Sequence, residues 1–167
     1  MRSLLWLIAL PLLVSCESSE DLRDPLRPLE CRGAGEPRID QFEIGGDVGA
    51  FAPWSDGDTA VVELGIQGLF MIVVREHVHG AVLPRCMRQR TLVTLEGTLV
   101  GQYSGAVPIV PEGPGVGVTE PIFAVIFDRI PQPGEDVVVE SEVGGRTVSR
   151  RLRIVKAQPL DGGVEMP

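Results

Sequence analysis

The sequence predicts an all-β protein: one antiparallel β-sandwich of seven or eight strands. Three observations lead to this. From Ile39 onward, apolar and polar residues alternate with a period of two, the pattern of a strand with one buried face. Clusters of Gly, Pro and Asp interrupt the alternation at short intervals. Valine, a β-branched residue that favours strands, occurs 22 times among the 167 residues. The domain is therefore expected to be built from short strands joined by tight turns.

Each alternating segment is interpreted as one strand, and the connectors between them carry the turn residues. The expected strands are residues 38–44, 59–64, 69–78, 90–100, 102–110, 122–130, 136–143 and 146–155. Gly144 and Gly145 separate the last two. Two consecutive glycines favour a type I′ hairpin, because both central residues of that turn need a positive φ.

The chain length allows one ordinary domain. We expect a signal peptide at residues 1–15, a lipidated cysteine and flexible acidic tether at 16–37, the β-sandwich at 38–156 and a C-terminal tail at 157–167. The tether is charged and rich in turn residues, so it cannot bury enough apolar surface to offset the entropy of ordering it. It is predicted to act as a linker between Cys16 and the domain.

The N-terminus has the features of an export signal. Arg2 is the only charged residue before an apolar run at residues 4–14. Eleven helical residues span about 16 Å, roughly half of the hydrocarbon core of a bilayer, so the run is too short to be a membrane span. The run ends in Leu13-Val14-Ser15-Cys16.

These four residues resemble the lipobox of bacterial lipoproteins. The resemblance implies cleavage before Cys16 and acylation of its sulfur and its new amino group. In that family an Asp after the cysteine often retains the protein at the inner membrane, whereas here Glu17 follows. The resemblance thus implies a chain anchored by lipid at the outer membrane of the cell envelope, facing either the periplasm or the surface. The alternative is an ordinary secretory signal in which Cys16 stands by chance.

A second resemblance concerns the end of the domain. Pro133-Gly134-Glu135 precedes a strand, a Gly-Gly turn and a final strand. This segment is similar to the last hairpin of immunoglobulin-like modules on bacterial surfaces, including those of uncharacterised envelope lipoproteins. It implies that the predicted sandwich is immunoglobulin-like, although Trp54 lacks the Cys…Trp…Cys spacing of antibody domains.

With Cys16 acylated, Cys31 and Cys86 remain as a pair. In an oxidising compartment an even pair favours a disulfide. Such a bridge would fasten the end of the tether to the loop expected at residues 80–88. The alternative is two free thiols, one of them reactive or metal-binding.

His77 and His79 are the only histidines. Their i, i+2 spacing puts both rings on one face of a strand, about 6.6–7 Å apart, close enough to share a metal. A third ligand would have to come from the neighbours of Glu76, from Cys86 or from Met87. The alternative is a polar strand end that points to solvent.

Oxygen ligands for Ca²⁺ are also present in the Gly-rich segment 45–58, at Asp47, Asp56 and Asp58. The spacing is not that of an EF-hand, and Asp-Gly-Asp is also a plain turn sequence.

Composition limits the function classes. The formal net charge is −8, and an acidic chain lacks the basic face that nucleic-acid binding needs. There is no Gly-x-Ser-x-Gly and no His-Glu-x-x-His motif, so no enzyme activity and no cofactor are predicted.

A basic ribbon near the C-terminus is the remaining candidate for binding. Arg151 and Arg153 share the outward face of the last strand, and Arg150 faces inward with Val148, Leu152 and Ile154. The ribbon either protects the strand edge or binds an anionic surface polymer or an acidic partner. The leading hypothesis is a lipid-anchored, non-catalytic structural or interaction module of the envelope. The alternative is a zinc- or copper-binding lipoprotein that uses His77 and His79.

Overall fold

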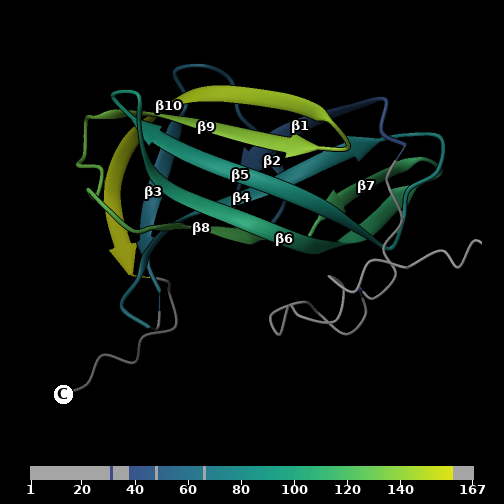
Figure 1. Ribbon diagram of the computed structural model, residues 1–167, viewed down its shortest axis with the longest axis horizontal. Helices are drawn as coiled ribbons and strands as arrows, with labels where there is room; N and C mark the ends of the chain where they lie inside the picture. The colour runs from purple at the N-terminus through teal and green to yellow at the C-terminus, as the bar shows by residue number, and fades with distance from the viewer. Residues whose placement is uncertain (1–30, 32–37, 48, 66, 160–167) are drawn as a thin grey trace, which may run out of the picture.

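The computed structural model describes residue 31 and residues 38–47, 49–65 and 67–159. Ten strands within these residues form a single sheet (Figure 1). The strands are β1 Gln41–Gly46, β2 Ala52–Pro53, β3 Thr59–Leu64, β4 Phe70–His79, β5 Cys86–Leu95, β6 Thr98–Gly113, β7 Val116–Thr119, β8 Ile122–Ile126, β9 Asp136–Val143 and β10 Arg146–Pro159.

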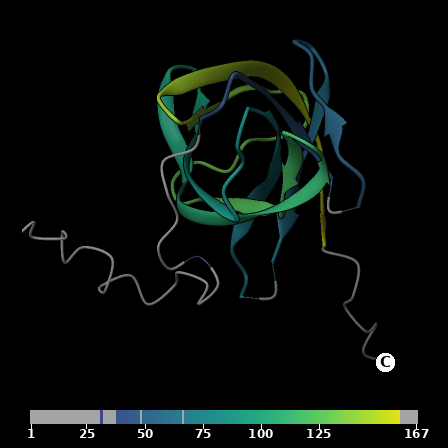
Figure 2. The ribbon, with the colours of Figure 1, turned by 90° about the vertical axis from the view of Figure 1, so that its right-hand side faces the viewer.

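Seven of these strands close into a barrel. Their order is β4-β3-β10-β9-β5-β6-β8, and β8 pairs with β4 to complete the ring. Figure 2 shows the strands arranged as a closed ring. Further along β4, the neighbours change: β1 pairs with it on the side of β3, and β7 pairs with it on the side of β8. The strand β4 is thus paired along both edges.

The prediction of an immunoglobulin-like sandwich is wrong, although the all-β class is confirmed. A sandwich consists of two separate sheets, whereas here the sheet closes on itself and includes a parallel pair, β3 with β10. Period-two alternation marks a strand with one buried and one exposed face, and the wall of a barrel has this property as much as a sandwich does. The pattern therefore specified strands but not how they close.

The core fills the barrel with the inward side chains of each strand. On β4 these are Ile72, Val74, Glu76 and Val78, as the alternation predicts. On β9 the buried positions also alternate, from Val137 to Val143. Aliphatic residues dominate this core, and the partly buried Trp54 and Tyr103 pack against it.

Strand bounds agree with the sequence in some places and differ in others. The strands β3 and β9 have the predicted bounds, and Gly144 and Gly145 adopt the expected positive φ, 56° and 73°, in the hairpin between β9 and β10. The strand predicted at 90–100 is wrong, because Glu96 and Gly97 form a turn with φ of 52° and 79° that separates β5 from β6. The short strands β2 and β7 were not predicted.

The register defines two ends of the barrel. We call the end at Cys86, where β5 begins, the disulfide end, and the end at the β5–β6 turn the far end. The far end is on the left in Figure 1, where β5 ends, β6 begins and β10 ends. The strand β7 lies toward the disulfide end.

Candidate functional site

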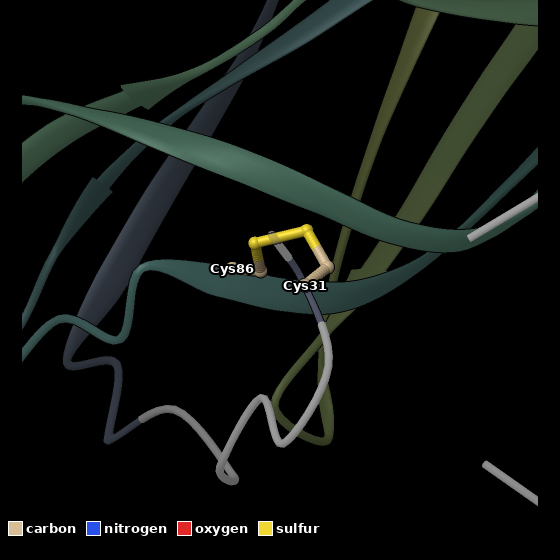
Figure 3. Close-up of a disulfide and its surroundings, with 2 residues drawn as sticks. All are labelled: Cys31 and Cys86. Atoms are coloured by element: carbon tan, nitrogen blue, oxygen red, sulfur yellow. A yellow bond between two sulfur atoms is a disulfide. The ribbon is translucent and has the colours of Figure 1, made fainter. Parts of the chain in front are cut away.

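The predicted disulfide is confirmed. The Cα atoms of Cys31 and Cys86 are 5.3 Å apart, and their sulfur atoms are bonded (Figure 3). Both cysteines are buried and form a small cluster with Ala106 of β6. The sequence predicts Cys86 in a loop at residues 80–88, but Cys86 is the first residue of β5. The bridge therefore fixes residue 31 to the barrel wall, and the alternative of two free thiols is wrong.

His77 and His79 lie on the outer face of β4, and their ring centroids are 4.6 Å apart. Two carboxylates from neighbouring strands approach His77. Its Nε2 is 3.0 Å from Glu112 of β6, without the alignment of a hydrogen bond, and its Nδ1 is 3.8 Å from Glu43 of β1. The ring of Phe51 contacts the same imidazole at a centroid distance of 5.3 Å. Alternation alone could not identify these carboxylates, because they come from other strands.

Two of the predicted sources of a third metal ligand, Cys86 and Met87, are not available to the histidine pair. Cys86 is in the disulfide and Met87 is buried in the core. Across the described parts of the chain, no group of three or more His, Cys, Asp or Glu side chains is placed to hold a metal ion. A structural zinc site normally has four protein ligands and a catalytic one has three, so two imidazoles fall short of either.

The three aspartates considered as Ca²⁺ ligands serve separate backbone groups. Asp47 accepts a hydrogen bond from the backbone N–H of Gly49, and Asp58 accepts one from Ser55. Asp56 accepts one from the backbone N–H of Arg151 in β10. Each carboxylate thus stabilises a turn or joins it to the sheet.

The arginines of β10 divide into two groups. Arg146 and Arg150 reach across to the segment around β1 and β2, where they donate to the backbone oxygens of Ile39 and Trp54 at 2.9 and 2.7 Å. Arg151 and Arg153 are exposed, as predicted, and Arg153 pairs with Asp136 of β9 at 3.0 Å. The side-chain hydrogen bond from Arg153, together with the nearby positive charges of Arg153 and Arg151, holds the pKa of Asp136 below its usual range.

A polar network inside the barrel was not singled out as a site from the sequence. Glu76 of β4 is fully buried, and the Gln89 Nε2 and the Thr119 hydroxyl donate to its two carboxylate oxygens. Gln89 Nε2 also lies 3.2 Å from the Thr91 hydroxyl, which contacts the Ser141 hydroxyl at 2.8 Å. The network thus joins β4, β5, β7 and β9 across the core. A glutamate at an inward position of a strand was the signal that could have revealed it.

Burial raises the pKa of Glu76 to about 7, because desolvation penalises the charged carboxylate. The hydrogen bonds from Ser141, Thr119 and Gln89 act in the opposite direction and offset part of the shift. The groups that hydrogen-bond to this carboxyl are all uncharged. The Oε1 of Gln89 is buried and has no hydrogen-bond partner among the described residues. Buried polar atoms of this kind cost free energy unless they are satisfied.

Arg75, next to Glu76 but on the outer face of β4, joins two further segments. Its Nε donates to the backbone oxygen of Thr119 at 2.9 Å, and its Nη1 donates to the backbone oxygen of Gly49 at 2.6 Å. The side chain is 7% exposed. Arg75 is thus buried although it is on the outer face of β4, and its hydrogen bonds go to backbone oxygens of two other segments.

One cavity of about 270 Å³ lies beside β3 and is lined by Asp47, Trp54, Thr59 and Glu63 among others. Burial and the neighbouring charge of Asp47 raise the pKa of Glu63. Both carboxylates belong to the outer surface and not to the network around Glu76.

Three comparisons bear on relatives of the chain. No family model, no curated protein and no solved structure matches it.

No helix in the described residues is long and apolar enough to cross a membrane. Cys16, the predicted signal peptide and the predicted tether apart from Cys31 lie outside the described residues. Of the tail predicted at 157–167, residues 157–159 belong to β10, and residues 160–167 lie outside the described part.

Proposed function

We propose that this protein is a lipid-anchored module of the bacterial cell envelope that displays a rigid β-barrel for interaction with a partner. In this proposal, Cys16 carries the acyl chains at the outer membrane and the barrel is the non-catalytic binding body. Several acyl chains give a stable anchor, unlike a single one, because each buried CH₂ contributes about 0.8 kcal/mol.

The disulfide is the observation that best supports the proposal. A bond between Cys31 and Cys86 is the expected state of paired cysteines in an oxidising compartment and is rare in a reducing cytosol. Export is what the apolar run and the lipobox-like sequence imply. The bridge also fastens the chain to the barrel 15 residues after Cys16. An extended segment of that length reaches at most about 50 Å, which limits how far the disulfide end stands from the lipid.

Metabolic labelling tests the anchor. The full chain is expressed in bacteria with an alkyne analogue of palmitate, and the label is detected after immunoprecipitation. We expect label in the natural chain and none in Cys16→Ala, with Ser15→Ala as a matched control that keeps the cysteine. Label retained by Cys16→Ala, or absent from the natural chain, would overturn the proposal.

A further inference from the structure

The far end of the barrel exposes several large apolar side chains. Phe127, directly after β8, is 55% exposed, and Leu69, directly before β4, is 43% exposed. Leu99 of β6 and Phe123 of β8 are also exposed. We call these four residues, Leu69, Leu99, Phe123 and Phe127, the far-end patch. Leu64 is not included, because it pairs with Phe70, which packs against the core.

The pairing of the strands makes these residues neighbours. The backbone N–H of Phe127 donates to the oxygen of Val100 at 3.0 Å, which puts Phe127 beside Leu99. Met71 pairs with Val125, so the same register extended by two residues places Leu69 opposite Phe127. Phe123 is on the same exposed side of β8 as Phe127, four residues earlier. The strand pairing thus brings the four residues to the outer side of three neighbouring strands, β4, β8 and β6. Contiguous patches of this kind mark interaction sites more often than single exposed residues do.

The patch lies away from the disulfide. The strand β5 runs ten residues from Cys86 to Leu95, and Leu95 pairs with Thr98, the residue before Leu99. At about 3.3 Å per residue this separates the two ends by roughly 30 Å. A chain anchored through Cys16 and fixed at Cys31 therefore presents the patch at the opposite end of the barrel.

Acidic groups predominate beside the patch. Asp128 directly follows Phe127, and Glu96 lies in the turn before β6, three residues before Leu99. Arg129 pairs with Glu96 and Glu135. These segments thus carry three carboxylates and one guanidinium group. Arg151 and Arg153 are on β10, which is not a neighbour of β8 in the barrel, so they do not belong to this rim.

We propose that the far-end patch is the docking surface for a partner protein whose contact surface has an apolar centre and a basic rim. This inference rests on the proposed function, because display requires a surface that faces away from the anchor. The exposed Phe and Leu side chains supply the apolar centre of the interface, where aromatic side chains contribute most to binding. The carboxylates around them select a basic rim on the partner and accelerate its association.

Charge disfavours two other occupants. Anionic lipid headgroups would repel the carboxylates, and the proposed anchor places the bilayer toward the disulfide end. A second copy of this chain would bring two acidic rims together.

Site-specific photo-crosslinking in cells that express the full chain tests the proposal. The probe is p-benzoylphenylalanine at position 127, and the matched control carries the same probe at position 82. Val82 is 67% exposed and lies four residues before Cys86, at the disulfide end. We expect a protein adduct from position 127 and none from position 82, with a several-fold lower yield after Leu69→Asp. Sequencing the crosslinked peptide should identify a surface with Lys or Arg beside apolar residues.

Four outcomes would overturn the docking surface: no adduct at position 127, a dimer of this chain, a lipid adduct, or the same adduct from position 82. Palmitate labelling of the same cells keeps this result separate from the proposed function. A labelled chain without an adduct contradicts the docking surface alone, and an unlabelled chain with the adduct contradicts the anchor.

Because Leu69 is exposed, Leu69→Asp should keep the melting temperature of the natural chain, which is measured on the purified protein.

Discussion

Gln89 and Glu76 face each other inside the barrel, and the amide Nε2 of Gln89 donates a hydrogen bond to Oε1 of Glu76. Both side chains are buried, at 3% and 0% exposure. The carboxyl is thus held by hydroxyl and amide groups in a core that is otherwise mostly aliphatic. Such a group makes the stability of the fold depend on pH.

Glu76→Gln should remove part of that pH dependence. The pKa of Glu76 is about 7 in the folded barrel and 4.5 in an ordinary setting. The natural chain therefore has its full stability below pH 4.5, where both states are protonated, and loses it as pH rises through about 7. At pH 8 the loss amounts to about 3 kcal/mol, at 1.36 kcal/mol per pKa unit. Urea unfolding at pH 5 and pH 8 should show the variant gaining stability over the natural chain at the higher pH.

The matched control is Glu140→Gln, which changes an exposed carboxylate on β9. It should leave the pH dependence of the natural chain unchanged. If the natural chain and Glu76→Gln respond identically to pH, the buried carboxylate does not have the raised pKa.

The inward position of Glu76 illustrates how far the sequence could predict this structure. Alternation placed Glu76 on the core face of its strand, and the same reasoning placed Arg150 inward among aliphatic residues. Alternation could not identify the hydrogen-bond partners of Glu76. Gln89, Thr119 and Ser141 come from other strands, and the pairing of those strands depends on closure of the barrel. Closure in turn depends on two long-range pairings, β3 with β10 and β8 with β4. Period-two alternation carries no information about which strands pair, so the barrel was predicted as a sandwich.

Local signals were more reliable. The Gly144-Gly145 turn was predicted from its residue types, because consecutive glycines favour positive φ. The disulfide was predicted from an even pair of cysteines in a chain expected to be exported. The turn at Glu96-Gly97 was missed because Glu is an unusual residue for positive φ. Its neighbours continue the alternation, and so the turn was hidden inside a predicted strand.

Arg75→Met should destabilise the barrel through its backbone contacts. The substitution keeps an apolar stem of similar length but removes the donors to Thr119 and Gly49. Hydrogen bonds from a charged donor contribute about 1.5–3 kcal/mol each, so a loss of about 2 kcal/mol or more is expected in urea unfolding. Arg90→Met, at an exposed position of β5, is the control and should stay within about 0.5 kcal/mol of the natural chain. Equal stabilities for the two variants would show that the bonds of Arg75 contribute nothing measurable.

Titration with zinc should distinguish a polar strand end from a metal site at His77 and His79. We expect no saturable heat at micromolar Zn²⁺ in isothermal titration, because two imidazoles without a placed third ligand make an incomplete site. His77→Ala with His79→Ala is the matched control and should give the same trace. A saturable heat that disappears in this variant and in Glu112→Gln would instead establish a site that recruits Glu112 on binding.

Replacing Cys31 and Cys86 together by serine should lower the free energy of unfolding by up to about 4 kcal/mol. The bridge closes a loop with a sequence separation of 55 residues, and the chain-entropy relation gives this value at 25 °C. Reduction of the natural chain with dithiothreitol should give a loss of the same size, and Cys16→Ser should be as stable as the natural chain. Since the barrel pairs all of its strands without the bridge, the double variant should still refold, and its far-ultraviolet circular dichroism should stay that of a β-protein. If reduction leaves the urea midpoint unchanged, the bridge acts only to fasten residue 31 to the barrel, and its stabilising role is disproved.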